Sequence, residues 1–159
     1  MKITKHFIIV IFAACFITSC ENENVNNSQS NFYGKLVKHS ECKQENIVLQ
    51  DDVPENVSQI NYSFDAATNK LTLKHINVEF NCCIDSLYSD ISLVNDTILI
   101  KEFEFVTNPC RCKCLYDLEM LVTGVEAKKY TVKITEPYNI VFDIDLKTTT
   151  TGSFNIIMF

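Results

Sequence analysis

The stretch INYSFDAATNKLTL, residues 60–73, decides the fold class. Apolar Ile60, Tyr62 and Phe64 alternate with polar residues, and the alternation resumes at Leu71 after a short run of small and polar residues. Successive side chains of a β-strand point to opposite faces of the sheet, so this pattern predicts two half-buried strands joined by a turn.

The period of two residues continues along the chain. Ile76, Val78 and Phe80 have the opposite parity to Leu71, which predicts a β-bulge near Lys74-His75. Further alternating segments lie at 91–93, 97–106, 115–123, 130–135, 140–146 and 153–159. No window shows a convincing helical period, so we predict an all-β fold, an antiparallel β-sandwich of about eight strands in a single domain over residues 32–159.

One corner suggests a subtype of sandwich. The segment Gly124–Val132 resembles the corner before a late strand of an immunoglobulin-like domain, in which a tyrosine hydrogen-bonds back to the chain. The resemblance implies that role for Tyr130 and an immunoglobulin-like sandwich. A hairpin with a half-buried tyrosine is the alternative interpretation.

The N-terminus predicts where the protein resides. Lys2 and Lys5 precede the apolar run Phe7–Ile17, which is too short to span a bilayer and is typical of a signal peptide. The sequence Ile17-Thr18-Ser19-Cys20 resembles the lipobox of bacterial lipoproteins. The resemblance implies cleavage of residues 1–19 and lipid attachment at Cys20. A rival cleavage point at Ala13-Ala14-Cys15 would leave a very short apolar core.

Residues 20–31 follow as a polar stretch with a single apolar residue, Val25. Such a segment buries too little apolar surface to fold, so we interpret it as the lipidated N-terminus and a flexible tether. The protein is then expected in the cell envelope, attached to the outer membrane by its N-terminal lipid.

Composition narrows the function. The formal net charge of −6 argues against nucleic-acid binding, and three glycines do not suffice for a phosphate-binding glycine-rich loop. His75, at the expected bulge, is interpreted as a solvated or hydrogen-bonded residue, not as a ligand. No catalytic residue, cofactor or metal ligand is predicted from these patterns.

Six cysteines remain after Cys15 and Cys20 are set aside. They are Cys42, Cys82, Cys83, Cys110, Cys112 and Cys114. An even number in an exported domain predicts disulfides. Residues two apart in a strand are separated by about 6.7 Å and bridge poorly, so each member of the 110/112/114 triplet should pair outside the triplet.

Parity adds a finer prediction. The triplet shares the parity of the apolar face that follows it, so all three side chains should face the core. Cys82 should then bond one triplet member across the interior, while Cys42 and Cys83 tie neighbouring loops to it. The alternative is a thiolate site for Zn²⁺ or Cu(I), or a thiol-redox site, built from Cys82, Cys83 and the triplet.

As a whole, the chain resembles small cysteine-containing β-sandwich lipoproteins of Gram-negative envelopes. The resemblance implies no activity. We therefore expect a non-enzymatic, membrane-anchored binding or structural module, stabilised by disulfides, whose partner is an envelope protein or a glycan. A metal-binding or thiol-redox lipoprotein is the alternative.

Overall fold

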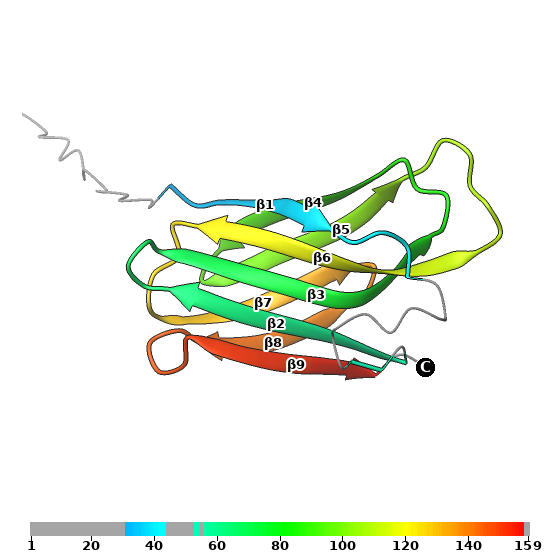
Figure 1. Cartoon of the computed structure of the whole chain (residues 1–159). Coiled ribbons are helices and arrows are strands. Elements are labelled where there is room, and N and C mark those ends of the chain that lie inside the picture. Colours follow the sequence, from blue (N-terminus) through cyan, green and yellow to red (C-terminus); the bar gives the residue numbers. More distant parts are fainter. Residues whose placement is uncertain (1–30, 44–52, 55, 158–159) are drawn as a thin grey trace, which may run out of the picture.

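The computed structural model describes residues 31–43, 53–54 and 56–157. These residues form nine β-strands and no helix, so the predicted all-β fold is confirmed with one strand more than expected (Figure 1). The strands are β1 (Tyr33–His39), β2 (Val57–Asp65), β3 (Lys70–Asn81), β4 (Ser86–Val94), β5 (Thr97–Phe105), β6 (Lys113–Thr123), β7 (Lys129–Glu136), β8 (Ile140–Asp145) and β9 (Thr151–Ile157).

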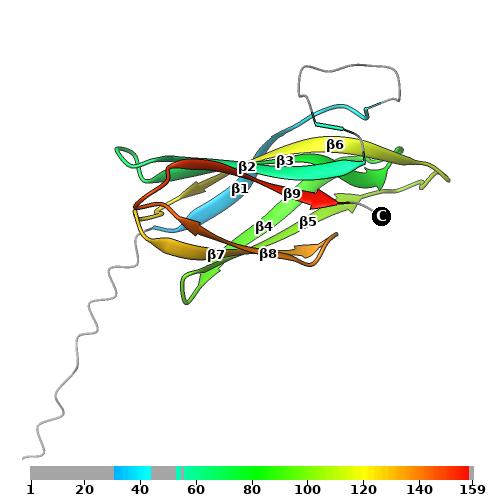
Figure 2. The same ribbon diagram turned by 90° about the horizontal axis from the view of Figure 1, so that it is seen from below.

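The strands form two packed sheets. One sheet has the order β1-β6-β3-β2-β9 and the other β4-β5-β7-β8. Figure 2 shows them edge-on as two layers, which is the arrangement of a β-sandwich. Every paired strand is antiparallel except β5 and β7, which run parallel, so the purely antiparallel prediction is corrected at that pair.

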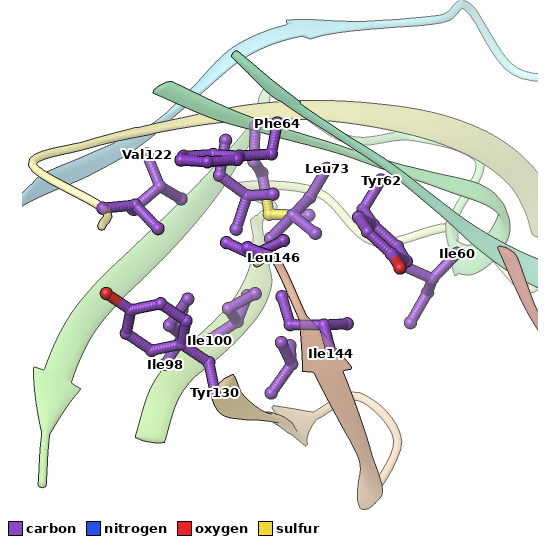
Figure 3. Close-up of a cluster of buried hydrophobic side chains, with 14 of the residues drawn as sticks. Ile60, Tyr62, Phe64, Leu73, Ile98, Ile100, Val122, Tyr130, Ile144 and Leu146 are labelled. Carbon is purple, nitrogen blue, oxygen red and sulfur yellow. The ribbon is translucent and has the colours of Figure 1, made fainter. Parts of the chain in front are cut away.

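The alternating pattern produces the core between the sheets. Ile60, Tyr62, Phe64 and Leu73 of the first sheet face Ile98, Ile100, Tyr130 and Ile144 of the second (Figure 3). We call this the central cluster. A second cluster, the sulfur-end cluster, comprises Val78, Phe80, Leu87, Cys114, Tyr116 and Leu118. Full burial of each large aliphatic side chain contributes about 1.5–3 kcal/mol, so these inner faces dominate the stability.

A bulge separates the two clusters along β3. The register with β6 passes from His75↔Leu118 to Val78↔Tyr116, so β3 has one extra residue there. Asn77 within the bulge has a φ of 60°. The predicted bulge is therefore present, but it lies one to two residues later than expected, and His75 keeps the inward parity of Leu73.

The predicted corner at 124–132 contains its hydrogen bond. The backbone N–H of Glu126 donates to the Tyr130 hydroxyl at 3.0 Å. Gly124, with a φ of 74°, turns the chain at this point, and a side chain there would collide with the backbone of Asn31. The Tyr130 contact expected from the immunoglobulin-like corner is thus confirmed.

Candidate functional site

The cysteines of the domain gather at one end of the β3–β6 pair. Cys82 and Cys83 follow β3 directly, Cys110 and Cys112 precede β6, and Cys114 lies within β6. Two disulfides join them to each other and to the segment after β1. These are Cys42–Cys114, with Cα atoms 5.4 Å apart, and Cys83–Cys110, with Cα atoms 5.8 Å apart.

Both disulfides obey the predicted rule for the triplet. Cys114 and Cys110 each bond a cysteine from outside the triplet, and Cys42 and Cys83 tie neighbouring segments as expected. The expected bond of Cys82 to a member of the triplet is not formed. Cys82 and Cys112 are both free thiols.

The predicted core-facing orientation of the whole triplet is also corrected. Cys114 is buried, Cys110 is half-buried and Cys112 is exposed. The reason is that β6 begins only at Lys113. The period of two residues therefore does not extend back to Cys110, and parity arguments fail in the preceding loop.

The two free thiols lie just beyond the β3–β6 pair, with their sulfurs within 4.8 Å of each other. The pairs Phe80↔Cys114 and Asn81↔Lys113 place Cys82 opposite Cys112 at the next position. The Cys82 N–H donates to the carbonyl oxygen of Cys112 at 3.3 Å, as this register requires. A hydrogen bond that the Cys82 thiol donates to the Cys112 sulfur, followed by partial desolvation, raises the pKa of the Cys82 thiol.

Asn81 organises the loops that carry these sulfurs. Its side-chain oxygen accepts the N–H of Cys83 at 2.9 Å, and its side-chain amide donates to the carbonyl of Cys110 at 2.8 Å. Its own carbonyl accepts the Tyr116 hydroxyl at 3.1 Å. Asn81 is buried, so these bonds satisfy its polar atoms and fix both loops. Asn81 was not identified as a structural residue in the sequence analysis. Its position as a polar residue at the end of an otherwise apolar strand face could have indicated this role.

The positions of the sulfur atoms bear on the alternative prediction of a thiolate site for Zn²⁺ or Cu(I). The sulfurs of Cys82, Cys110 and Cys112 lie within 4.8 Å of one another, as do those of Cys42, Cys82 and Cys114. Structural zinc sites use four deprotonated ligands. In each group at least one sulfur is held in a disulfide, so the present oxidation state does not fit a thiolate metal site.

A second polar group lies between the two apolar clusters. His75 of β3 contacts Ser58 of β2 and Glu102 of β5. The Ser58 Oγ lies 2.8 Å from His75 Nε2, and a Glu102 carboxylate oxygen lies 2.8 Å from His75 Nδ1. The contact to Glu102 crosses from one sheet to the other. His75 is therefore hydrogen-bonded, one of the two outcomes expected for it, although it lies just before the bulge and not in it.

These three residues have the order of a catalytic serine–histidine–acid group, but not its accessibility. Ser58 and His75 are 0% exposed and Glu102 is 1% exposed. The Ser58 hydroxyl also bonds the carbonyl of Ile76 at 3.1 Å. A nucleophile must reach substrate, so we interpret the group as an internal link between the sheets.

The outer face of the β4–β5 hairpin carries a group of neighbouring aromatic side chains. Tyr88 and Phe103 are cross-strand partners whose rings stack with centroids 5.6 Å apart. Phe105 shares the outward parity of Phe103, and Tyr88 and Phe105 are 47% and 56% exposed. We call Tyr88, Phe103 and Phe105 the aromatic patch. Exposed neighbouring aromatic side chains are typical of binding surfaces.

The comparisons with known proteins add no relative. No family model, no curated protein and no solved structure matches the chain. Cys20 and the predicted signal peptide and tether, apart from Asn31, lie outside the described residues. Within the described ranges no helix is long and apolar enough to cross a membrane.

Proposed function

We propose that this chain is a lipid-anchored envelope protein whose β-sandwich is a non-enzymatic binding module. The aromatic patch is the observation that carries the proposal, since it offers a partner a rigid surface on a strand pair. The partner is an envelope protein or a glycan. Aromatic side chains suit both, because their faces contact apolar groups and sugar rings and Tyr88 adds a hydroxyl.

The disulfides support an exported location. Disulfides persist in oxidising compartments and are rare in a reducing cytosol. The Cys42–Cys114 and Cys83–Cys110 bonds agree with the lipobox-like sequence that ends at Cys20. The burial of Ser58, His75 and Glu102 supports a role other than catalysis, since the one serine–histidine–acid group found among the described residues lies inside the sandwich.

The anchor is tested by replacing its cysteine. We expect the wild-type chain to stay in the membrane fraction and to enter solution only with detergent, whereas Cys20→Ser is released into the soluble fraction. The reason is that acyl chains attached at one residue supply the membrane affinity. Cys15→Ser is the matched control and should stay in the membrane. Release of Cys15→Ser with retention of Cys20→Ser would move the anchor to the rival position.

Partner binding is tested at the aromatic patch. We expect Tyr88→Ser/Phe105→Ser to bind isolated envelopes at least about tenfold more weakly than wild type, since truncating a hot-spot side chain of an interface costs about 2 kcal/mol or more. Binding is measured by sedimentation of the labelled, lipid-free chain with envelopes. Protease treatment of the envelopes abolishes binding to a protein and spares binding to a glycan.

Ser63→Asp is the control for this experiment. Ser63 is exposed on β2, in the other sheet, so its substitution leaves the aromatic patch untouched. Equal binding by wild type and the double variant would remove the patch from the proposal. Weaker binding by Ser63→Asp alone would move the binding surface to the other sheet.

A thiol-redox role is the second candidate. It is favoured by one distance, the 3.1 Å that separates the sulfur of the Cys112 thiol from the Cys110 sulfur of the second disulfide. A thiolate next to a disulfide sulfur is the starting arrangement for thiol–disulfide exchange. Repeated turnover of a disulfide substrate by the purified chain separates this candidate from a binding module.

A further inference from the structure

We propose that Cys82 and Cys112 form a dithiol site that an organic disulfide oxidises to a third intramolecular disulfide, with Cys112 reacting first. The inference deepens the second candidate function. It does not require the protein to turn over a disulfide substrate repeatedly. If the site is oxidised only once, the inference holds and the thiol-redox function is excluded.

Backbone geometry favours bonding between these two residues. They lie one position beyond the last β3–β6 pair, Asn81↔Lys113, and the N–H of Cys82 bonds the carbonyl of Cys112 at 3.3 Å. Opposite residues of an antiparallel pair have Cα atoms about 4.5–5.5 Å apart. Disulfides use Cα separations of about 4.4–6.8 Å, a range that includes this spacing.

The remaining cysteines of the domain support the same pair. Four of the six are already paired as Cys42–Cys114 and Cys83–Cys110. Cys82 and Cys112 are the two left, and their sulfurs already lie within 4.8 Å of each other. A Cys82–Cys112 bond would complete three bridges, each joining a triplet member to a cysteine outside the triplet.

Exposure sets the order of the reaction. Cys112 is exposed, whereas Cys82 is half-buried against the sulfur-end cluster. The raised pKa of Cys82 keeps that thiol protonated, and the thiolate is the nucleophile in exchange. An external disulfide should therefore meet Cys112 first, and Cys82 should act as the resolving thiol.

The chemistry balances in two exchange steps. The Cys112 thiolate attacks one sulfur of the external disulfide, the S–S bond of that reagent breaks, and half of it leaves as a thiolate. The Cys82 thiol then loses its proton and attacks the Cys112 sulfur of the mixed disulfide. The second half of the reagent leaves as a thiolate, so the reagent gains two electrons and the two protein thiols lose two electrons and two protons.

Closing the third bond also protects the second. The Cys112 sulfur lies 3.1 Å from that of Cys110, where its thiolate could displace Cys83 and leave a Cys110–Cys112 bond. Engaging Cys112 with Cys82 removes that nucleophile. The site would then keep the Cys83–Cys110 loop in one connectivity.

The test uses the full-length protein isolated in detergent from its own envelope and oxidised glutathione as the probe. Free thiols are alkylated under denaturing conditions without reductant, before and after incubation with the probe. We expect the wild type to end with no alkylated cysteine among the six. Tryptic cleavage after Arg111 and Lys113 separates the triplet, so the Cys112-Lys113 dipeptide should appear bonded to the peptide that holds Cys82.

Three variants identify the roles. Cys82→Ser should retain glutathione at Cys112 as a stable mixed disulfide, whereas Cys112→Ser should react at least about tenfold more slowly at Cys82, which is less exposed than Cys112. Cys82→Ser/Cys112→Ser is the control that should keep both other bonds and gain no glutathione. Two alkylatable thiols remaining in the treated wild type would overturn the proposal. So would a Cys110–Cys112 bond or faster reaction of Cys112→Ser than of Cys82→Ser.

Discussion

Cys42→Ala/Cys114→Ala should lower the free energy of unfolding by about 4.4 kcal/mol, because this disulfide closes a long loop. The two residues are separated by 72 positions. A cross-link over that span restricts the unfolded chain far more than the folded one. The bond also connects the segment after β1 to β6, where Lys43 pairs with Leu115 in an isolated bridge. Urea unfolding of the non-reduced protein measures the loss.

The other disulfide supplies the matched control. Cys83–Cys110 closes a span of 27 residues, so Cys83→Ala/Cys110→Ala should lose about 3.5 kcal/mol by the same chain-entropy argument. Double replacement leaves no new unpaired thiol in either variant. A Cys42→Ala/Cys114→Ala protein within about 1 kcal/mol of wild type would contradict the assigned role, since removal of a native disulfide typically costs 2–5 kcal/mol.

Most of the strands could be predicted from the sequence, because the alternation of apolar residues within one strand is enough to identify its inner face. Ile60, Tyr62 and Phe64 reveal the orientation of β2 without reference to any other strand. The order of strands within the sheets is a different matter, since it depends on pairings between distant segments. The parallel pairing of β5 with β7 left no local trace and was not predicted.

The cysteine site could be predicted only in part for the same reason. The rule against pairs within the triplet held for both disulfides, although the strand spacing that it assumed does not extend to Cys110 and Cys112. Individual partners depend on the register of β3 against β6, which the bulge at Asn77 shifts by one residue. The prediction extended the alternation of β6 back over the whole triplet, but β6 begins only at Lys113. The predicted orientation of Cys112 was therefore wrong.

The buried group of Ser58, His75 and Glu102 was not predicted in the sequence analysis, although the strand parity of His75 and Glu102 indicates that both face inward. Glu102 continues the inward parity of Ile98 and Ile100, and a carboxylate on an apolar face requires a buried partner. His75 continues the parity of Leu71 and Leu73. The pairing itself could not be read from the sequence, because it joins strands of different sheets.

Glu102→Ala should lower the free energy of unfolding by about 1–3 kcal/mol, the typical cost of leaving a buried hydrogen-bonding group without its partner. The carboxylate accepts from His75 Nδ1 at 2.8–2.9 Å, and both side chains are shielded from water. Without Glu102 the imidazole would lose this acceptor inside the sandwich, where water cannot replace it freely. The midpoint of urea unfolding reports the loss.

Two further variants separate the lost pairing from the lost volume. Glu102→Gln keeps an acceptor of nearly the same shape, so it should lose less than Glu102→Ala. His75→Leu/Glu102→Leu removes both polar groups and should recover most of the stability, because replacing a buried pair by apolar residues of similar size is often neutral. If the double variant were as unstable as Glu102→Ala, the three residues would serve packing alone. Their position between the central and sulfur-end clusters would then matter more than their hydrogen bonds.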